Sequence, residues 1–105
     1  MTRRTKASLY PQLESFFAGY LNQDFPETYG DVAGAVRAFA ADARPSERQA
    51  LAREWRAFRV EAGEDVTVTT LGRILASKFG AAWAPRRRSE VDQFDRLIRG
   101  LGTRA

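Results

Sequence analysis

Three carboxylates, Asp24, Glu27 and Asp31, lie close together in the first third of this 105-residue sequence. Grouped carboxylates can act as a general acid and base, or supply oxygen ligands to a hard cation such as Ca²⁺. Their spacing matches no calcium-binding loop, and no second acidic cluster complements them. The set therefore does not indicate a catalytic or metal site, and we expect neither.

The residues that most often carry out chemistry are missing. The sequence contains no His and no Cys. It therefore lacks the commonest general base, the commonest metal ligand and every Ser–His or Cys–His arrangement for nucleophilic catalysis. Disulfides and zinc–thiolate sites are excluded as well. These absences argue against an enzyme and against a cofactor, and the missing Cys fits a reducing cytoplasm.

A polar cluster follows the first apolar segment, within the stretch GYLNQDF. It comprises Asn22, Gln23, Asp24 and Phe25. In one interpretation these side chains belong to a surface that contacts a partner. In the other they form a structural corner, in which Gly19 permits close helix packing and the polar side chains satisfy backbone groups at the helix end. The pattern favours the corner, and a contribution of Asp24 to binding stays open.

Three consecutive arginines, Arg86, Arg87 and Arg88, follow Trp83 in the segment WAPRRR. Adjacent side chains cannot all share one helix face, so the run belongs to a loop or to a helix start. At a helix N-terminus each cation would oppose the helix dipole, at a cost of about 0.3–1 kcal/mol. The run can contact an acidic partner or form a solvated surface, and Trp83 can be a loop anchor or a binding hot spot.

The charge balance is basic, with a formal net charge of +4 from fifteen Arg and two Lys against thirteen acidic residues. The two signs are interleaved, which is typical of a mixed, solvated surface. In one long helical segment we expect six charged side chains to lie only on the surface. They are Glu47, Arg48, Glu54, Arg56, Arg59 and Glu61.

No apolar run approaches the ~20 residues that a membrane span needs, so we expect no membrane partner. The basic start MTRRTKASLY has no apolar segment behind it and is not typical of a secretory signal. We interpret residues 1–8 as a flexible basic tail and residues 9–102 as one helical domain, located in the cytoplasm.

Apolar residues recur at helical spacing in five segments, with Trp55 and Phe58 on the stripe of the third. The first segment spans 11–21, FPETYG is expected to be a loop, and EDVTVTT an extended linker. The other four segments have predicted starts, namely the cap Asp31 for the second, the cap Ser46 or Pro45 as first helical residue for the third, the cap Thr69 or Thr70 for the fourth, and the cap Ser89 for the last. The third, fourth and last segments are predicted to end at Gly63, Gly80 and Gly102. The pattern predicts an all-α fold, a single-domain compact bundle of about five amphipathic helices.

The pattern LESFFAGYLNQDF, then AVRAF, then ILASKFGAAWAP and a last helix bearing an aromatic residue resembles the small all-helical CdiI-type immunity proteins of bacterial contact-dependent growth inhibition. The residues that match the family's first motif are Leu13, Phe16, Gly19, Tyr20, Gln23 and Asp24. Phe25 stands where the family has Trp, and Asn22 where it often has His. Phe79, Gly80 and Trp83 fit a later motif. The resemblance runs from about Leu9 to Leu101.

This resemblance implies a protein without enzymatic activity, whose partner is a cognate toxin domain that it binds and neutralises inside the producing cell. Such an interface needs aromatic or Arg anchors with a polar rim. The alternative is a small basic helical DNA-binding transcriptional regulator, with Arg73 and Lys78 on the segment TTLGRILASKFG. Apolar residues occupy most of that segment, and the turn before it is unlike that of a helix-turn-helix. We therefore do not expect nucleic acid as a partner.

Overall fold

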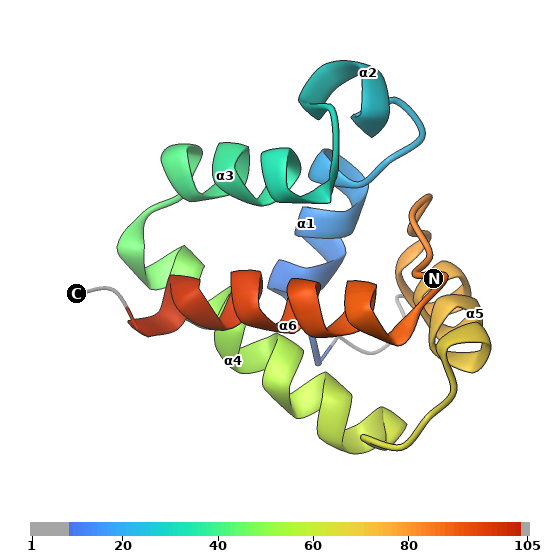
Figure 1. The fold of residues 1–105 in the computed structure, drawn as a ribbon. Coiled ribbons are helices and arrows are strands. Elements are labelled where there is room, and N and C mark those ends of the chain that lie inside the picture. The colour runs from blue at the N-terminus through green and yellow to red at the C-terminus, as the bar shows by residue number, and fades with distance from the viewer. Residues whose placement is uncertain (1–8, 104–105) are drawn as a thin grey trace, which may run out of the picture.

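The computed structural model describes residues 9–103, which form six helices and no strand (Figure 1). The helices are α1 (Pro11–Tyr20), α2 (Phe25–Tyr29), α3 (Val32–Asp42), α4 (Pro45–Ala62), α5 (Val68–Phe79) and α6 (Arg88–Thr103). The predicted all-α fold is confirmed. The tail predicted for residues 1–8 lies outside the described residues.

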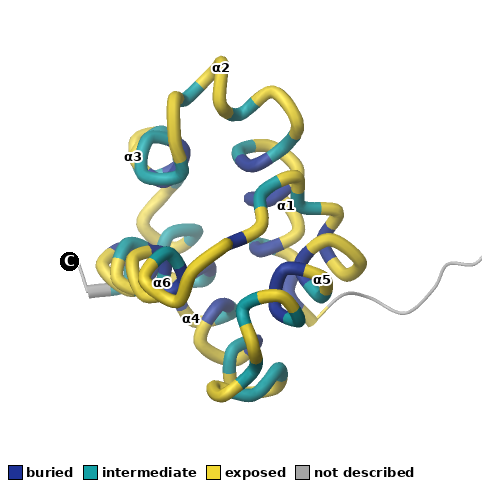
Figure 2. Tube along the Cα trace, turned by 45° about the vertical axis from the view of Figure 1, so that its right-hand side comes forward, coloured by how far each residue is buried: buried dark blue, intermediate teal, exposed yellow. Residues whose placement is uncertain are grey.

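Helix α6 runs across the front of the molecule, with α3 on one side, α4 on the other and α1 behind it (Figure 1). The buried residues lie where the helices face one another (Figure 2). Phe94 of α6 anchors this arrangement, because its ring lies 6.2 Å from the rings of Phe16 and Phe17 in α1 and 4.8 Å from Trp55 in α4. Trp55 is 3% exposed and belongs to the core, as predicted.

The segment FPETYG was expected to be a loop, and this prediction is wrong, because it forms the short helix α2. Pro26 stands in the first turn, where the fixed φ of proline suits a helix and its missing N–H is not needed. The helix ends at Gly30, whose φ of 85° is easily adopted only by glycine. Asp31 then caps α3 as predicted, since its carboxylate accepts the Gly34 N–H at 2.8 Å.

Two predicted helix starts are also wrong. Helix α5 begins two or three residues earlier than expected, because the Thr67 hydroxyl, rather than that of Thr69 or Thr70, caps it by accepting the Thr70 N–H at 3.1 Å. Helix α6 begins at Arg88, so Ser89 lies inside its first turn. In that turn the Glu90 carboxylate accepts a hydrogen bond from the Arg86 N–H, just before the helix, at 2.8 Å.

Two of the three predicted glycines end their helices, and the third lies inside its helix. Gly63 and Gly80 close α4 and α5 with φ values of 96° and 66°. Gly102 does not close α6, which continues to Thr103. A Cβ atom at Gly102 would lie 2.9 Å from the Cβ of Ala52, so this glycine allows α4 and α6 to approach closely.

The charged side chains of α4 tie the helices together. Glu54 caps the start of α1 by accepting the N–H groups of Gln12 and Leu13 at 2.8 and 3.0 Å. Arg48 donates to two carbonyl groups at the end of α3, at 2.9 and 3.3 Å. The remaining bonded members of the predicted surface set are Glu47, Arg59 and Glu61. Arg56 and Glu61 are exposed as predicted, whereas the other four members are only partly exposed and take part in contacts that the prediction did not include.

Candidate functional site

The described residues form two open hollows, one on each side of α6. The larger, of about 730 Å³, lies between α6, α4 and the connection from α4 to α5. The smaller, of about 310 Å³, lies between α6, α2 and the start of α3. Helix α6 lines both, with Asp92, Asp95 and Arg99 on one side and Gln93 and Phe94 on the other.

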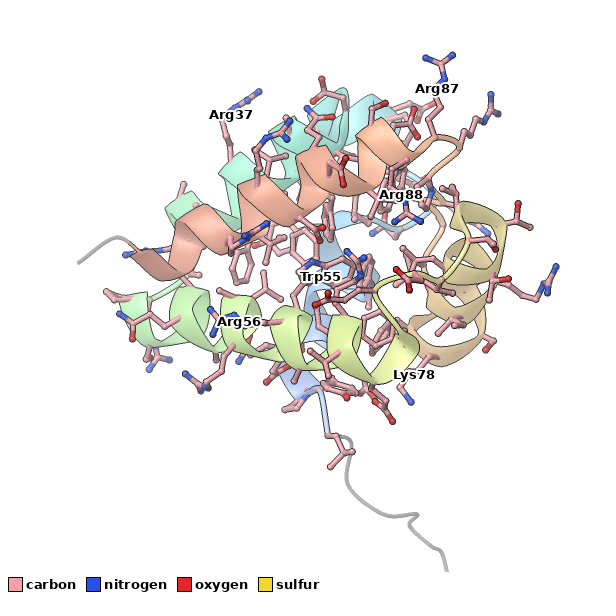
Figure 3. The ribbon with its side chains drawn as sticks, turned by 60° about the horizontal axis from the view of Figure 1, so that its bottom comes forward. Arg37, Trp55, Arg56, Lys78, Arg87 and Arg88 are labelled. Atoms are coloured by element: carbon pink, nitrogen blue, oxygen red, sulfur yellow. The ribbon has the colours of Figure 1, made fainter. Side chains whose placement is uncertain are left out.

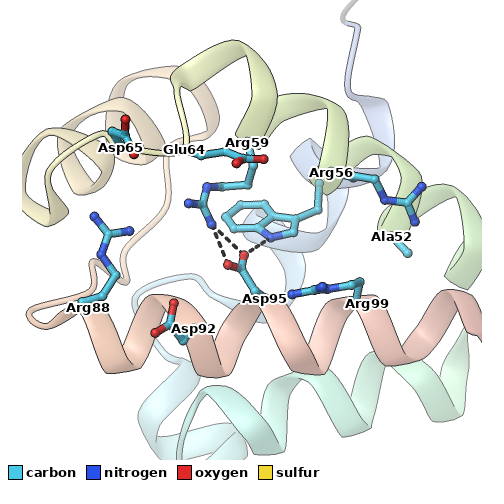
Figure 4. A pocket seen from close by; sticks show the side chains of 10 residues that line it. Ala52, Arg56, Arg59, Glu64, Asp65, Arg88, Asp92, Asp95 and Arg99 are labelled. Carbon is cyan, nitrogen blue, oxygen red and sulfur yellow. Dashed lines mark hydrogen bonds and ion pairs between the residues drawn. The ribbon is translucent and has the colours of Figure 1, made fainter.

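Three side chains are bonded together in the larger hollow (Figure 4). Asp95 of α6 accepts a hydrogen bond from Trp55 Nε1 at 2.7 Å. Nη1 of Arg59 lies 2.8 and 2.7 Å from the two oxygens of the same carboxylate. The side chains of Arg59 and Asp95 are only 11% and 19% exposed. Because both oxygens of Asp95 are engaged, this group joins α4 to α6 and offers no free base to a substrate.

Sequence analysis missed Asp95, although one signal was available. A buried indole N–H usually finds a hydrogen-bond partner, and Trp55 was expected in the core. An acceptor on a facing helix was therefore required. The sequence alone could not say which carboxylate supplies it.

The charged side chains are unevenly distributed along the larger hollow, with carboxylates and one cation at one end and two cations at the other (Figure 4). Asp65, Asp92 and Arg88 lie toward one end, and the Arg88 guanidinium donates to the Val66 carbonyl at 2.7 Å. Arg56 and Arg99 lie toward the other end, beside Ala52.

The smaller hollow brings together two residues that the sequence analysis singled out, Phe25 and Trp83. Both are half-buried. The ring of Trp83 lies 5.1 Å from that of Phe94, which is buried beneath it. Their segments meet because the Ala82 N–H donates to the Leu21 carbonyl at 3.1 Å. The hollow thus presents aromatic surface at the corner after α1.

The corner itself depends on Asn22. Its Nδ2 donates to the Ala18 carbonyl at 3.1 Å, and its Oδ1 accepts the Asp24 N–H at 3.0 Å. Gln23 and Asp24 are exposed, and the carboxylate of Asp24 makes no capping bond to α2. Gly19 does not permit close packing as expected, because a Cβ atom there would meet nothing within 4 Å.

The three arginines diverge, as their adjacent positions predicted. Arg87 points away from the body of the protein, whereas Arg88 turns toward the larger hollow (Figures 3 and 4). Arg86 is exposed, and its backbone N–H is held by Glu90. The run therefore serves two different surfaces.

The described residues contain no group of three or more carboxylates placed to hold a metal ion. Within the same range, no helix is long and apolar enough to cross a membrane. Asp24, Glu27 and Asp31 do not form such a group, and Asp31 is used as the cap of α3.

The fold and its open hollows define a small all-α protein. A family model described as CdiI immunity protein matches residues 9–97, well over half of the chain. The chain therefore belongs to the CdiI immunity protein family, which confirms the resemblance seen in the sequence and supports an immunity function in general. Searches of curated proteins and of solved structures found no match.

Proposed function

We propose that this protein binds the toxin domain of its cognate contact-dependent growth inhibition effector and neutralises it by protein–protein interaction. The observation that carries the proposal is the family match over residues 9–97. Inhibition by binding requires no catalytic group of the inhibitor's own. In this account the protein acts in the cytoplasm of the producing cell and has neither enzymatic activity nor a nucleic-acid partner.

The docking face that we propose is centred on α6. This helix lies across the front of the molecule (Figure 1). A hollow opens on each side of it. The helix also exposes Arg96 and Gly100, which line neither hollow. A partner can be complementary in shape to a ridge flanked by two concavities, and such complementarity favours a specific and oriented complex.

Phe25 and Trp83 are the aromatic anchors of the proposed interface. Half-buried aromatic rings over a packed floor are typical of hot spots, because a partner completes their desolvation. The polar rim of this part of the interface would come from Gln23, Asp24 and Arg87, which are exposed. Asn22 supports the rim by holding the corner.

Co-expression tests the proposal without knowledge of the toxin's activity. The toxin domain encoded beside the gene is induced in cells that carry this protein or an empty vector, and survival and co-purification are scored. We expect survival with a stoichiometric complex, and death with the empty vector. Death despite abundant folded protein would exclude the immunity function.

A further inference from the structure

Asp95 of α6 is the carboxylate near the middle of the larger hollow (Figure 4). Arg59 and Trp55 of α4 engage both of its oxygens. Asp95 makes no bond to Arg56 of α4 or to Arg99 of α6, which line the same hollow. This leaves positive charge concentrated at one end of the hollow.

Arg56 of α4 and Arg99 of α6 are the two cations at that end (Figure 4). Both are exposed, and among the described residues neither has a hydrogen bond or an ion pair. By contrast, the other two arginines of the hollow are engaged, Arg59 with Asp95 and Arg88 with the Val66 carbonyl.

Two guanidinium groups on facing helices repel each other, and an anion placed between them removes that repulsion. A concave wall also focuses the field of the charges that line it. The planar fork of a guanidinium matches the two oxygens of a carboxylate, which gives such a contact both strength and direction.

We propose that Arg56 and Arg99 bind carboxylate side chains of a toxin segment that enters the larger hollow. This inference rests on the proposed function and names the chemistry of the partner at that site. The segment is acidic where it meets the two arginines, and the indole and methyl surfaces of Trp55 and Ala52 line the wall beside it.

The opposite end of the hollow favours a protein over a nucleic acid. Among the described residues, Glu64, Asp65 and Asp92 line it beside a single cation, Arg88, so negative charge is in excess there, and all four side chains are exposed. A polyphosphate chain lying along the hollow would meet these carboxylates and be repelled. A protein segment can be acidic at one end and neutral or basic at the other, so the separation of charge also sets its direction.

The test compares charge reversals within and outside the hollow. Dissociation constants for the toxin domain are measured by calorimetry for Arg56→Glu, Arg99→Glu and the double variant. The control is Arg37→Glu on α3, an equally exposed arginine that points away from the hollow (Figure 3). We expect Kd to rise about 10-fold for each single variant and about 100-fold for the double variant, and to change less than about 2-fold for the control.

Thermal unfolding shows that the variants remain folded, which we expect because both arginines are exposed. The double variant Arg56→Gln/Arg99→Gln, which removes charge without reversing it, should show a smaller loss of affinity. If the wild-type protein binds the toxin and the charge-reversed double variant binds it equally well, this inference is overturned and the proposed function is not. A wild-type protein that binds no toxin would overturn the proposed function with it.

A DNA duplex of about 12 base pairs is the second probe. We expect no binding by the wild-type protein at low salt. Duplex binding that disappears in Arg56→Glu/Arg99→Glu, with toxin affinity unchanged, would assign the two arginines to phosphate groups instead and overturn the inference.

Discussion

Asp95 accepts hydrogen bonds from two residues of α4 and is the polar link between the two longest helices. Its removal would leave the partly buried charge of Arg59 without a counter-ion and the Trp55 N–H without an acceptor. The loss of one partner from such a pair is costly because the other stays desolvated. We predict that Asp95→Ala lowers the free energy of unfolding by about 3 kcal/mol. Urea denaturation measures this change.

The matched control for that variant is Asp92→Ala, three residues earlier on α6. Asp92 lines the same hollow but is exposed and makes no hydrogen bond or ion pair among the described residues. Its replacement should leave the denaturation midpoint nearly unchanged. Equal effects of the two substitutions would show that the contacts of Asp95 contribute little to stability.

Tyr20 makes stability depend on alkaline pH. Burial raises the pKa of its hydroxyl to about 12, and the hydrogen bond that it donates to Asp42 at 2.9 Å acts in the same direction. An unfolded tyrosine loses its proton near pH 10. The folded state therefore keeps the Tyr20 proton up to a higher pH than the unfolded state does. The stability that this difference contributes is complete below pH 10 and is lost as the pH rises toward 12.

We therefore predict that Tyr20→Phe makes the free energy of unfolding fall less steeply between pH 9 and 12 than it does in the wild type. Part of the fall will remain, since the hydrogen bond from Tyr10 to Glu61, together with burial, raises the pKa of Tyr10 as well. Denaturant midpoints across this pH range measure the slopes. Identical slopes for the two proteins would contradict the assignment.

Two glycines in helices should respond to alanine in opposite directions. A Cβ atom at Gly34 in α3 would lie 2.1 Å from the Tyr29 carbonyl oxygen, so α2 and α3 would have to separate. We predict a loss of about 1–3 kcal/mol of stability for Gly34→Ala, from overpacking. At Gly19 in α1 a methyl group meets nothing, and Gly19→Ala should stabilise by about 0.5–1 kcal/mol. Thermal unfolding of both variants checks the two signs.

The amphipathic helices could be predicted because the spacing of their apolar residues repeats with the helical period. In α6, for example, Val91, Phe94 and Ile98 are buried as that spacing requires. Helix α2 was missed because it has only five residues and buries none fully, so it carries no such pattern. The bonds of Glu54 were missed for another reason, since they join residues far apart in the sequence. Those of Arg48 reach back across the turn between α3 and α4, whose geometry the helical spacing does not predict.

The candidate site could be predicted only in part, because it depends on how whole helices sit beside one another. The aromatic residues Phe25 and Trp83 were identifiable as residues outside the main apolar stripes, but their meeting in one hollow is a property of the fold. The larger hollow was not foreseen. Arg56 was taken for an ordinary surface cation, and Arg99 was not singled out.

At the scale of the whole molecule, the aromatic hollow should contribute to binding more than to stability. We predict that Phe25→Ala weakens toxin binding at least about 10-fold, as expected of a hot spot, with a smaller relative change in the denaturation midpoint. Phe25 suits this test better than Trp83, whose ring packs on the buried Phe94. If Phe25→Ala lowers the stability but leaves the affinity for the toxin unchanged, the smaller hollow is not part of the docking face.

The immunity function is tested most directly by a calorimetric titration of the purified toxin domain with this protein. We expect saturable binding with a dissociation constant of roughly 10 nM or below, as in other tight inhibitor complexes of standard interface size. A correctly folded protein that shows no saturable binding at concentrations of ~100 µM would contradict the account.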